Sequence, residues 1–357
     1  MAGLVLAGPV ALRLFAADQD AKAQVAAEIQ RAEQANKSAN SAMPEVVKDA
    51  HGALKAAGES LQSNSVYLAL ERLLQAYDLF EGVGEVTAKA HTVEKNMAAF
   101  DAEWDKTSQE LTSLSSQVKA KNWNGSPAAI RAMAETALGR SVPLLDGGRG
   151  FALATGPADG LFYVGQARGE AKFANFCASL QVAGNKPGWS ARSMLPDLMA
   201  LQAKTDAAFK PPASIEQHPR FIALNSTIKL ARELDSTRFY YGALYQYLEA
   251  VRHYAMLDPA PVAANRQKEL KAAIDAERAK LAGSGRDDSI PQIFLERAAW
   301  QVAHPDGSAP SADEWRSAQA IVTEVLPAYA AAMKTAPALL ETKGKTVDVT
   351  LVRWPYT

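Results

Sequence analysis

The sequence predicts an all-α protein of two related antiparallel helical-bundle units, finished by a short C-terminal β-strand. Long stretches are rich in Ala, Glu, Gln and Lys, with Leu and Val three or four residues apart, which is the period of an amphipathic helix. Pro and Gly residues separate these stretches, as expected for short loops that connect neighbouring helices of a bundle. In addition, one part of the chain realigns on another, which predicts that the two units are related.

The realigned segments are residues 54–106 and 228–280, which match without a gap at a constant numbering offset of 174 (229 − 55). Between residues 53 and 106 there are 15 identities in 54 pairs, seven of them alanines, and the apolar positions keep their helical phase. An internal duplication explains this pattern, and chance similarity between alanine-rich helices is the alternative. The identical pairs include Lys55 with Lys229, Glu59 with Glu233, Tyr67 with Tyr241, Leu70 with Leu244 and Leu74 with Leu248.

The first helical unit is predicted over residues 18–138. Pro44 begins a helix, Glu59–Ser65 form a turn, and a strongly apolar helix follows over Val66–Phe80. Gly82–Gly84 predict a break, after which a further long helix is expected. Short turns of this kind join antiparallel neighbours in a bundle.

The two units are joined by residues 139–157, an irregular linker whose Leu145–Phe151 core predicts a turn or a small hairpin. This glycine-rich stretch lacks the spacing of a phosphate-binding loop. The second unit then covers residues 158–345. Near its start Gly165 and Gly169 lie four residues apart on a helix, where they predict a close crossing of two helices of this chain.

The second unit repeats the plan of the first, with an apolar helix over Phe239–Leu257 after a helix that Pro219 begins. Ser311 and Glu314 form a capping box, which marks the start of the last helix. In the terminal residues 346–357 apolar and polar side chains alternate. This alternation predicts a β-strand, which needs a partner for its backbone groups.

The cellular location of the protein is predicted from its N-terminal segment. Residues 1–17 resemble a signal peptide, because a short apolar run is followed by small residues up to Ala17, although no Lys or Arg precedes the run. A retained strand with Val10, Leu12 and Leu14 on one face is the alternative. Cleavage predicts a periplasmic or secreted protein, and retention predicts a cytoplasmic one.

Charge and cysteine content argue against several classes of partner. Lys plus Arg number 38 and Asp plus Glu number 39, with the signs mixed, so we expect no basic surface for nucleic acid or anionic membrane. No stretch reaches the roughly 20 apolar residues of a membrane span. The lone Cys177 cannot form an internal disulfide, and we expect a small buried side chain rather than a reactive thiol. No cofactor or metal site is predicted, because the Glu-x-x-His and His-Glu-x-x-His motifs do not occur.

The candidate ligand-binding residues lie on the helix predicted for residues 239–257. Tyr240, Tyr247 and Tyr254 recur every seven residues beside an inward apolar stripe, and each buried phenol requires a hydrogen-bond partner. Such a row can line a groove for a peptide, a sugar or an aromatic ligand. His253 joins them as a candidate ligand or base, one turn from Glu249. Packing between neighbouring helices is the alternative interpretation of the tyrosines.

Two functions are compatible with these features. The first is a non-enzymatic helical interaction or scaffold protein, exported from the cell, which binds a protein partner through helical faces or its terminal strand. The second is a small-ligand binding protein with a Tyr-lined site on helix 239–257. An enzyme comes third, because the sequence contains no recognisable constellation of acid, base and nucleophile.

Overall fold

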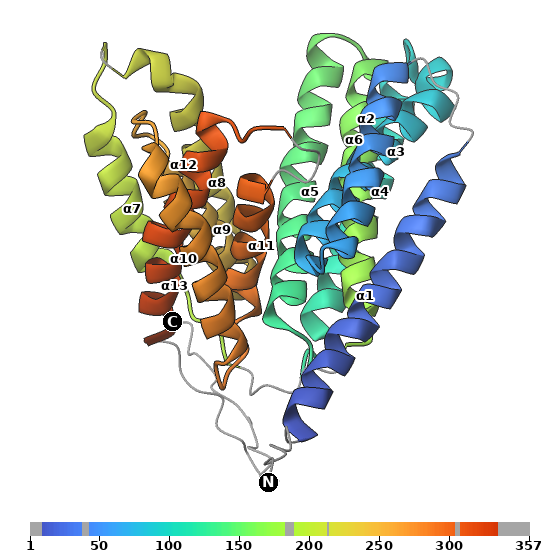
Figure 1. Ribbon diagram of the computed structural model, residues 1–357. Coiled ribbons are helices and arrows are strands. Elements are labelled where there is room, and N and C mark those ends of the chain that lie inside the picture. Colours follow the sequence, from blue (N-terminus) through green and yellow to red (C-terminus); the bar gives the residue numbers. More distant parts are fainter. Residues whose placement is uncertain (1–8, 38–42, 183–188, 213, 304–307, 335–357) are drawn as a thin grey trace, which may run out of the picture.

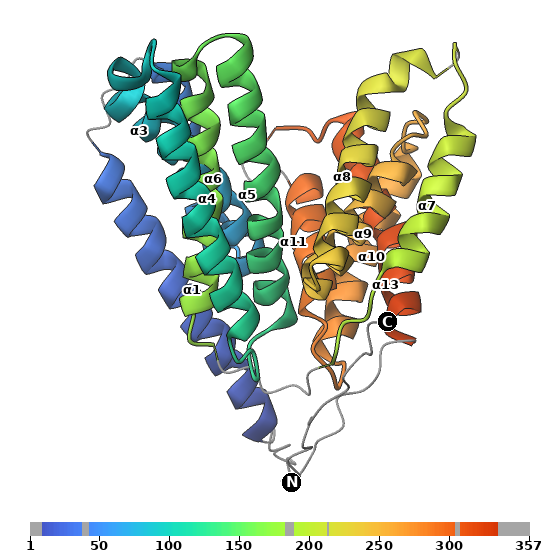
Figure 2. The ribbon, with the colours of Figure 1, turned by 180° about the vertical axis from the view of Figure 1, so that it is seen from behind.

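The computed structural model describes residues 9–37, 43–182, 189–212, 214–303 and 308–334. These residues form helices and connecting turns and contain no β-strand, which confirms the all-α prediction for this part of the chain. Figures 1 and 2 show two helical bundles standing side by side. The predicted terminal strand, residues 346–357, lies outside the described residues.

The N-terminal bundle consists of the first six helices. In it α6 packs along both α3 and α5, and α2 packs on α3. Helix α6 therefore belongs to the N-terminal bundle, although the sequence predicts that residues from 158 onward belong to the second unit. The helices are α1 (Pro9–Asn36), α2 (Pro44–Gln62), α3 (Val66–Val93), α4 (Met97–Ala120), α5 (Ala128–Ala154) and α6 (Pro157–Ser179). Because α1 begins at Pro9, the residues from Pro9 to Leu14 are helical and do not form the alternative strand.

The C-terminal bundle contains the remaining helices, which begin at Leu195. Ser311 and Glu314 form the predicted capping box at the start of α12, with both reciprocal hydrogen bonds present. The elements are α7 (Leu195–Ala208), the 3₁₀ turn η1 (Ile215–Gln217), α8 (His218–Ser236), α9 (Tyr240–Ala255), α10 (Ala264–Ala282), α11 (Ser289–Ala303), α12 (Ala312–Ala320), the π-helical turn η2 (Ile321–Val325) and α13 (Leu326–Lys334).

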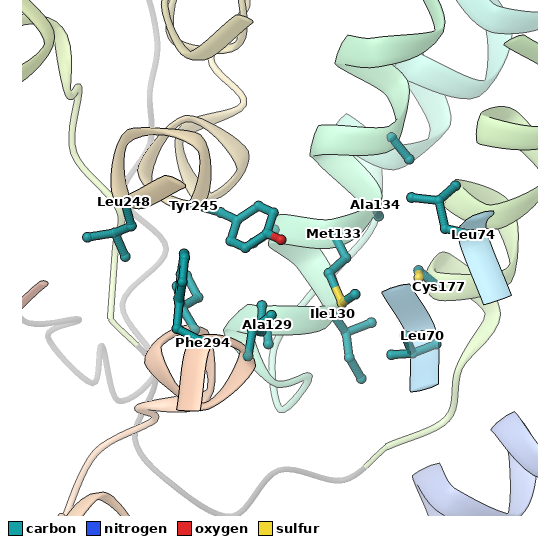
Figure 3. Packing of buried hydrophobic residues seen from close by; sticks show 14 of the residues in the cluster. Leu70, Leu74, Ala129, Ile130, Met133, Ala134, Cys177, Tyr245, Leu248 and Phe294 are labelled. Carbon is teal, nitrogen blue, oxygen red and sulfur yellow. The ribbon is translucent and has the colours of Figure 1, made fainter. Parts of the chain in front are cut away.

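One hydrophobic core extends through both bundles. Where they meet, α5 lies against α9 and α11 (Figure 1). Figure 3 shows Ile130 and Met133 of α5 between the Tyr245 and Phe294 side chains of the C-terminal bundle and the Leu70 side chain of α3. Cys177 is fully buried in this core, as predicted, and burial raises the pKa of its thiol. The two bundles are therefore not separate domains joined by a linker.

The predicted break at Gly82–Gly84 is wrong, because α3 continues to Val93. A Cβ atom on Gly82 would lie 2.7 Å from Cε2 of Phe162 in α6, so this glycine makes room for a neighbouring helix and does not end its own. Gly169 has the same role from the other side, since its Cβ would lie 2.8 Å from the Asp78 backbone. The close helix crossing predicted from Gly165 and Gly169 is thereby confirmed.

The irregular linker and hairpin predicted for residues 139–157 are also wrong, since α5 is helical as far as Ala154. A Cβ on Gly139 would lie 2.6 Å from Cδ2 of Leu234 in α8, and one on Gly148 would lie 2.9 Å from the Gly160 carbonyl oxygen of α6. The glycines permit α5 to pack closely on both bundles. This packing outweighs the low helix propensity of Gly and Pro, on which the sequence prediction depended.

The hairpins α2–α3 and α8–α9 have the same turn geometry. Asn64 and Arg238, which are equivalent positions when the realignment is extended through the turns, both adopt positive φ, at 56° and 64°. The amides that follow them donate across the turn in the same way, from Ser65 to the Ser60 carbonyl at 2.9 Å and from Phe239 to the Leu234 carbonyl at 2.8 Å. The realigned segments thus fold into the same local structure at their turns.

Each of these hairpins depends on a glutamate of the other bundle. The first turns of α3 and α9 have no side-chain cap of their own. Instead, the Leu68 amide of α3 donates to Oε2 of Glu296 in α11 at 2.9 Å, and the Gly242 amide of α9 donates to Oε2 of Glu135 in α5 at 2.8 Å. Leu68 and Gly242 are again equivalent positions of the realigned segments. The two buried glutamates therefore cap the helices of opposite bundles reciprocally.

Replacing Glu296 by Ala should destabilise the protein by about 1–3 kcal/mol, because the buried Leu68 amide loses its acceptor. Glu296→Gln keeps an acceptor oxygen and should cost less. The free energy of unfolding in urea measures both, with the exposed Glu269→Ala on α10 as a control expected to stay within about 0.5 kcal/mol of the parent. Equal stability of Glu296→Ala and this control would contradict the capping role.

The same site gives a pH dependence, because burial raises the pKa of Glu296 to about 8. Between the ordinary value of 4.5 and 8, the native state holds a proton that the unfolded chain has released. The free energy of unfolding of the parent should therefore fall with rising pH in this window, relative to Glu296→Gln, by at most ~1.4 kcal/mol per pH unit. A constant difference between the two proteins from pH 5 to 8 would be the contrary result.

Candidate functional site

A cavity of about 700 Å³ lies between the two bundles. Its walls come from α3, α5 and α6 on one side and from α8, α9 and α11 on the other. The lining residues Gln75 and Ser226 are exposed and mark its mouth, whereas Thr136, Phe173 and Glu249 are buried. Glu71 and Tyr245 line the cavity and follow the capped amides of Leu68 and Gly242 by three residues. The cavity therefore begins about one helical turn beyond the reciprocal caps.

Arg297 of α11 is the centre of an ion cluster that joins three helices in this cavity. Its guanidinium group donates to Glu71 of α3 and to Glu249 of α9. The Tyr245 hydroxyl donates to Oε1 of Glu71 at 2.6 Å, and Nε of Arg252 donates to Oε2 of Glu249 at 2.8 Å. Burial alone would raise the pKa of Glu249, but Arg252 and Arg297 hold it below its usual range. The Glu249 carboxylate is therefore ionised, and Arg252 and Arg297 compensate its charge.

Glu71 and Tyr245 are equivalent positions of the two realigned segments. These two side chains, which the realignment pairs, contact each other in the cavity. The cavity lining also includes the realigned pairs Gln75 with Glu249 and Asp78 with Arg252. The members of each pair differ in charge.

A second charged group lies on the other side of the cavity and consists of Arg140, Asp78 and Glu170. Nε of Arg140 lies 2.9 Å from Oε1 of Glu170, and its Nη2 lies 3.6 Å from Oδ2 of Asp78. The Asp78 and Glu170 side chains are 10% and 0% exposed, but that of Arg140 is 43% exposed. Arg140 therefore presents a guanidinium edge to the cavity, whose wall also includes Asp78, while Glu170 is fully buried.

Burial raises the pKa of both Asp78 and Glu170, although Arg140 opposes the shift. Two adjacent buried carboxyl groups beside one guanidinium favour a state in which they hold one proton between them. The close crossing at Gly169 creates this arrangement, because it brings the α6 backbone against Asp78 of α3. In that state the group of three carries no net charge.

His253 lies in the same cavity and adds a titratable group to its wall. Burial lowers its pKa, and the neighbouring Arg252 lowers it further, so the imidazole is neutral at pH 7. Three atoms of lining residues, Oδ1 of Asp78, Oγ1 of Thr136 and Oε1 of Gln301, are buried without a hydrogen-bond partner among the described residues. Such atoms favour a polar occupant.

The structure separates the four residues predicted to bind a ligand. His253 faces the cavity between the bundles, whereas Tyr247 and Tyr254 line a second cavity of about 910 Å³ within the C-terminal bundle, between α7, α9 and η2. Tyr240, half-buried at the first position of α9, is among the lining of neither cavity. Helix α9 thus stands between two cavities, and the tyrosine row does not form one site.

The charged residues at the centre of the site could not be identified from the sequence. Glu71 and Arg297 each lie within a mostly apolar helix, and Arg140 lies in the stretch predicted to be a linker. The sequence pattern places Glu71 and Arg297 on the apolar face of a predicted helix, and a charge in such a place requires a partner. The sequence does not show which residue is that partner.

The described residues contain no group of three or more His, Cys, Asp or Glu side chains arranged to hold a metal ion. Within the same residues, no helix combines the length and the hydropathy needed to cross a membrane. Fold and site together define an all-α protein of two bundles with a charged cavity at their junction. Comparison of the chain with protein-family models, curated proteins and solved structures yields no match.

The ion cluster at Arg297 should be essential for stability. Arg297→Met leaves the half-buried Glu71 and the buried Glu249 without their shared cation, and removal of one partner from a buried network costs about 3–5 kcal/mol. Urea unfolding measures the effect. Lys229→Met is the matched control, because Lys229 forms an exposed ion pair with Glu233 at 3.8 Å and should change stability by less than about 1 kcal/mol. Equal effects of the two changes would contradict the role of the cluster.

Proposed function

We propose that the protein is a non-enzymatic small-ligand binding protein and that its site is the cavity between the two bundles. The observation that carries the proposal is the cavity itself, with a volume of about 700 Å³. Ligand pockets commonly have volumes of about 300–1,000 Å³, with apolar walls and a few convergent polar groups. Leu74, Met133 and Phe173 supply apolar walls here, while Arg140 and His253 supply polar groups.

The electrostatics of the cavity also favour binding. The Arg297 cluster is compensated within the protein, so it holds the helices in place and does not repel an occupant of either sign. Arg140 is the lining cation with the most exposed side chain of those in ion pairs. A preformed site with fixed neighbours loses little conformational entropy when a ligand binds.

Filling the cavity should abolish ligand binding without unfolding the protein. Thr227 is a half-buried lining residue of α8, and Thr227→Trp places an indole in the cavity. Native mass spectrometry of the protein, isolated from the cell that makes it, should reveal a bound small molecule that is absent from this variant. A ligand at 100 times its Kd should also raise the free energy of unfolding of the parent by about 2.7 kcal/mol.

Thr323→Trp is the control, because Thr323 lines the second cavity instead. Loss of the ligand in Thr323→Trp, with retention in Thr227→Trp, would assign the site to the cavity of Tyr247 and Tyr254. Isolation of the parent without any bound molecule, together with the absence of thermal stabilisation by a library of polar metabolites, would contradict the proposal.

Protein binding is the second candidate function, as expected from the sequence for an exported scaffold protein. It is supported by Leu195 and Met199, which lie one turn apart on α7 with 46% and 60% of their surface exposed. Exposed apolar side chains in such positions are common in contact surfaces. Replacing both by Ser should prevent capture of a partner from the native cell, and unchanged capture would exclude this surface. Mass spectrometry of the mature N-terminus would test the proposed export.

We further propose that the two halves arose by duplication of a helical hairpin. The proposal is supported by the equal turns at Asn64 and Arg238, and by the ion pairs Lys55–Glu59 and Lys229–Glu233, which have the same distance of 3.8 Å. An experimental structure in which α2–α3 and α8–α9 do not superpose would contradict a common origin.

A further inference from the structure

The Arg140 guanidinium lines the cavity between the bundles, and the nearby carboxylates of Glu170, Asp78 and Glu71 raise its pKa. No Nη1 partner of Arg140 exists among the described residues, and its two carboxyl partners lie at Nε and Nη2. Arg252 and Arg297, the other lining arginines, donate to Glu249 and Glu71. An anion that enters the cavity therefore finds a free donor group at Arg140.

The surroundings of Arg140 limit the charge and the shape of such an anion. A single free guanidinium edge compensates about one negative charge, and the neutral His253 adds none. The half-buried Leu79 and Leu230 offer apolar surface in the same cavity. A phosphate dianion would have one negative charge without a partner and would make no contact with the apolar side chains. A monocarboxylate with an apolar body would pair its single charge with Arg140 and pack its body on these side chains.

The carboxyl pair that contacts Arg140, Asp78 and Glu170, adds a second property. While Asp78 and Glu170 hold one proton, the group of three is neutral, so a bound carboxylate brings an excess negative charge into a poorly solvated place. A second proton on the Asp78–Glu170 pair removes this excess negative charge. The positive charge of Arg140 can then pair with the carboxylate of the ligand. The remaining titratable groups of the lining are Glu71, Tyr245, Glu249, Arg252, His253 and Arg297. Of these, Glu71, Glu249, Arg252 and Arg297 are held in ion pairs.

We propose that the cavity binds a small organic monocarboxylate at Arg140, and that one proton is taken up by the Asp78–Glu170 pair when the ligand binds. This inference depends on the proposed function and adds the chemical class of the ligand. The carboxylate receives hydrogen bonds from the free edge of the guanidinium, and the apolar body lies toward Leu79 and Leu230. No covalent bond is made or broken apart from the transfer of this proton from solvent.

The test is calorimetry of the full chain with straight-chain monocarboxylates from acetate to octanoate, and with the alcohols and amines of the same lengths. The best acid should bind at least ten times more tightly than its alcohol, and the amine should not bind. Arg140→Met should abolish this preference, and Arg140→Lys should weaken it. Arg149→Met is the matched control, because Arg149 lies on the same helix and pairs with Asp101 instead.

Proton uptake is measured by the same titrations in two buffers of different ionisation enthalpy. About one proton should be taken up per acid bound near pH 7, and affinity should fall with rising pH by up to tenfold per unit between pH 6.5 and 8.5. The double variant Asp78→Asn with Glu170→Gln should bind the acid without proton uptake and without this pH dependence. If that variant does not fold, the pH dependence of the parent still decides the matter.

The outcomes separate this inference from the proposed function. Equal binding of acids and alcohols, abolished by Thr227→Trp, would overturn the carboxylate and leave the cavity as a ligand site. Acid binding that survives in Arg140→Met, or tighter binding of inorganic phosphate than of any organic acid, would overturn the assignment to a monocarboxylate. Absence of binding by the whole acid series at millimolar concentration would also overturn it, while native mass spectrometry would still decide the proposed function.

Discussion

The reciprocal capping of α3 and α9 is the interaction on which the rest of the structure depends. Both helices begin with amides that their own flanking residues leave unsatisfied, and each finds its acceptor in a buried glutamate of the other bundle. The two bundles cannot separate without exposing these amides or leaving them unpaired. Their contact is therefore fixed at the point where α3 and α9 start, and the cavity opens along the same helices one turn later.

Small residues make this contact possible. A Cβ on Gly242 would lie 2.9 Å from the Cβ of Glu135 and 3.2 Å from the Thr136 amide, so only glycine permits α9 to approach α5 closely enough for the cap. Gly169 permits a comparable approach of α6 to α3, and its consequence is chemical, because Asp78 and Glu170 then share the guanidinium of Arg140. Positions that lack a side chain thus decide where the charged side chains meet.

The sequence predicted the structure correctly where that structure depends on residues close together in the chain. Helical periodicity, the turn before α3 and the capping box at Ser311 depend on neighbours within a few residues, and the structure contains all three. The errors at Gly82–Gly84 and in residues 139–157 have one common reason. Glycine lowers helix propensity in any isolated segment, but in a bundle it can be the residue at which two helices touch, and the packing gained there keeps the helix intact.

The sequence by itself determined that the chain forms amphipathic helices, that its charges balance, and that two distant segments share a pattern. Only the tertiary structure decided that His253 faces a different cavity from Tyr247 and Tyr254, and that Arg297, Glu71 and Glu249 form one cluster. The physical reason is the range of the interactions. Helical phase is set by residues three or four positions apart, whereas a buried charge is stabilised by a partner that can be remote in the sequence, as Glu71 of α3 is from Arg297 of α11.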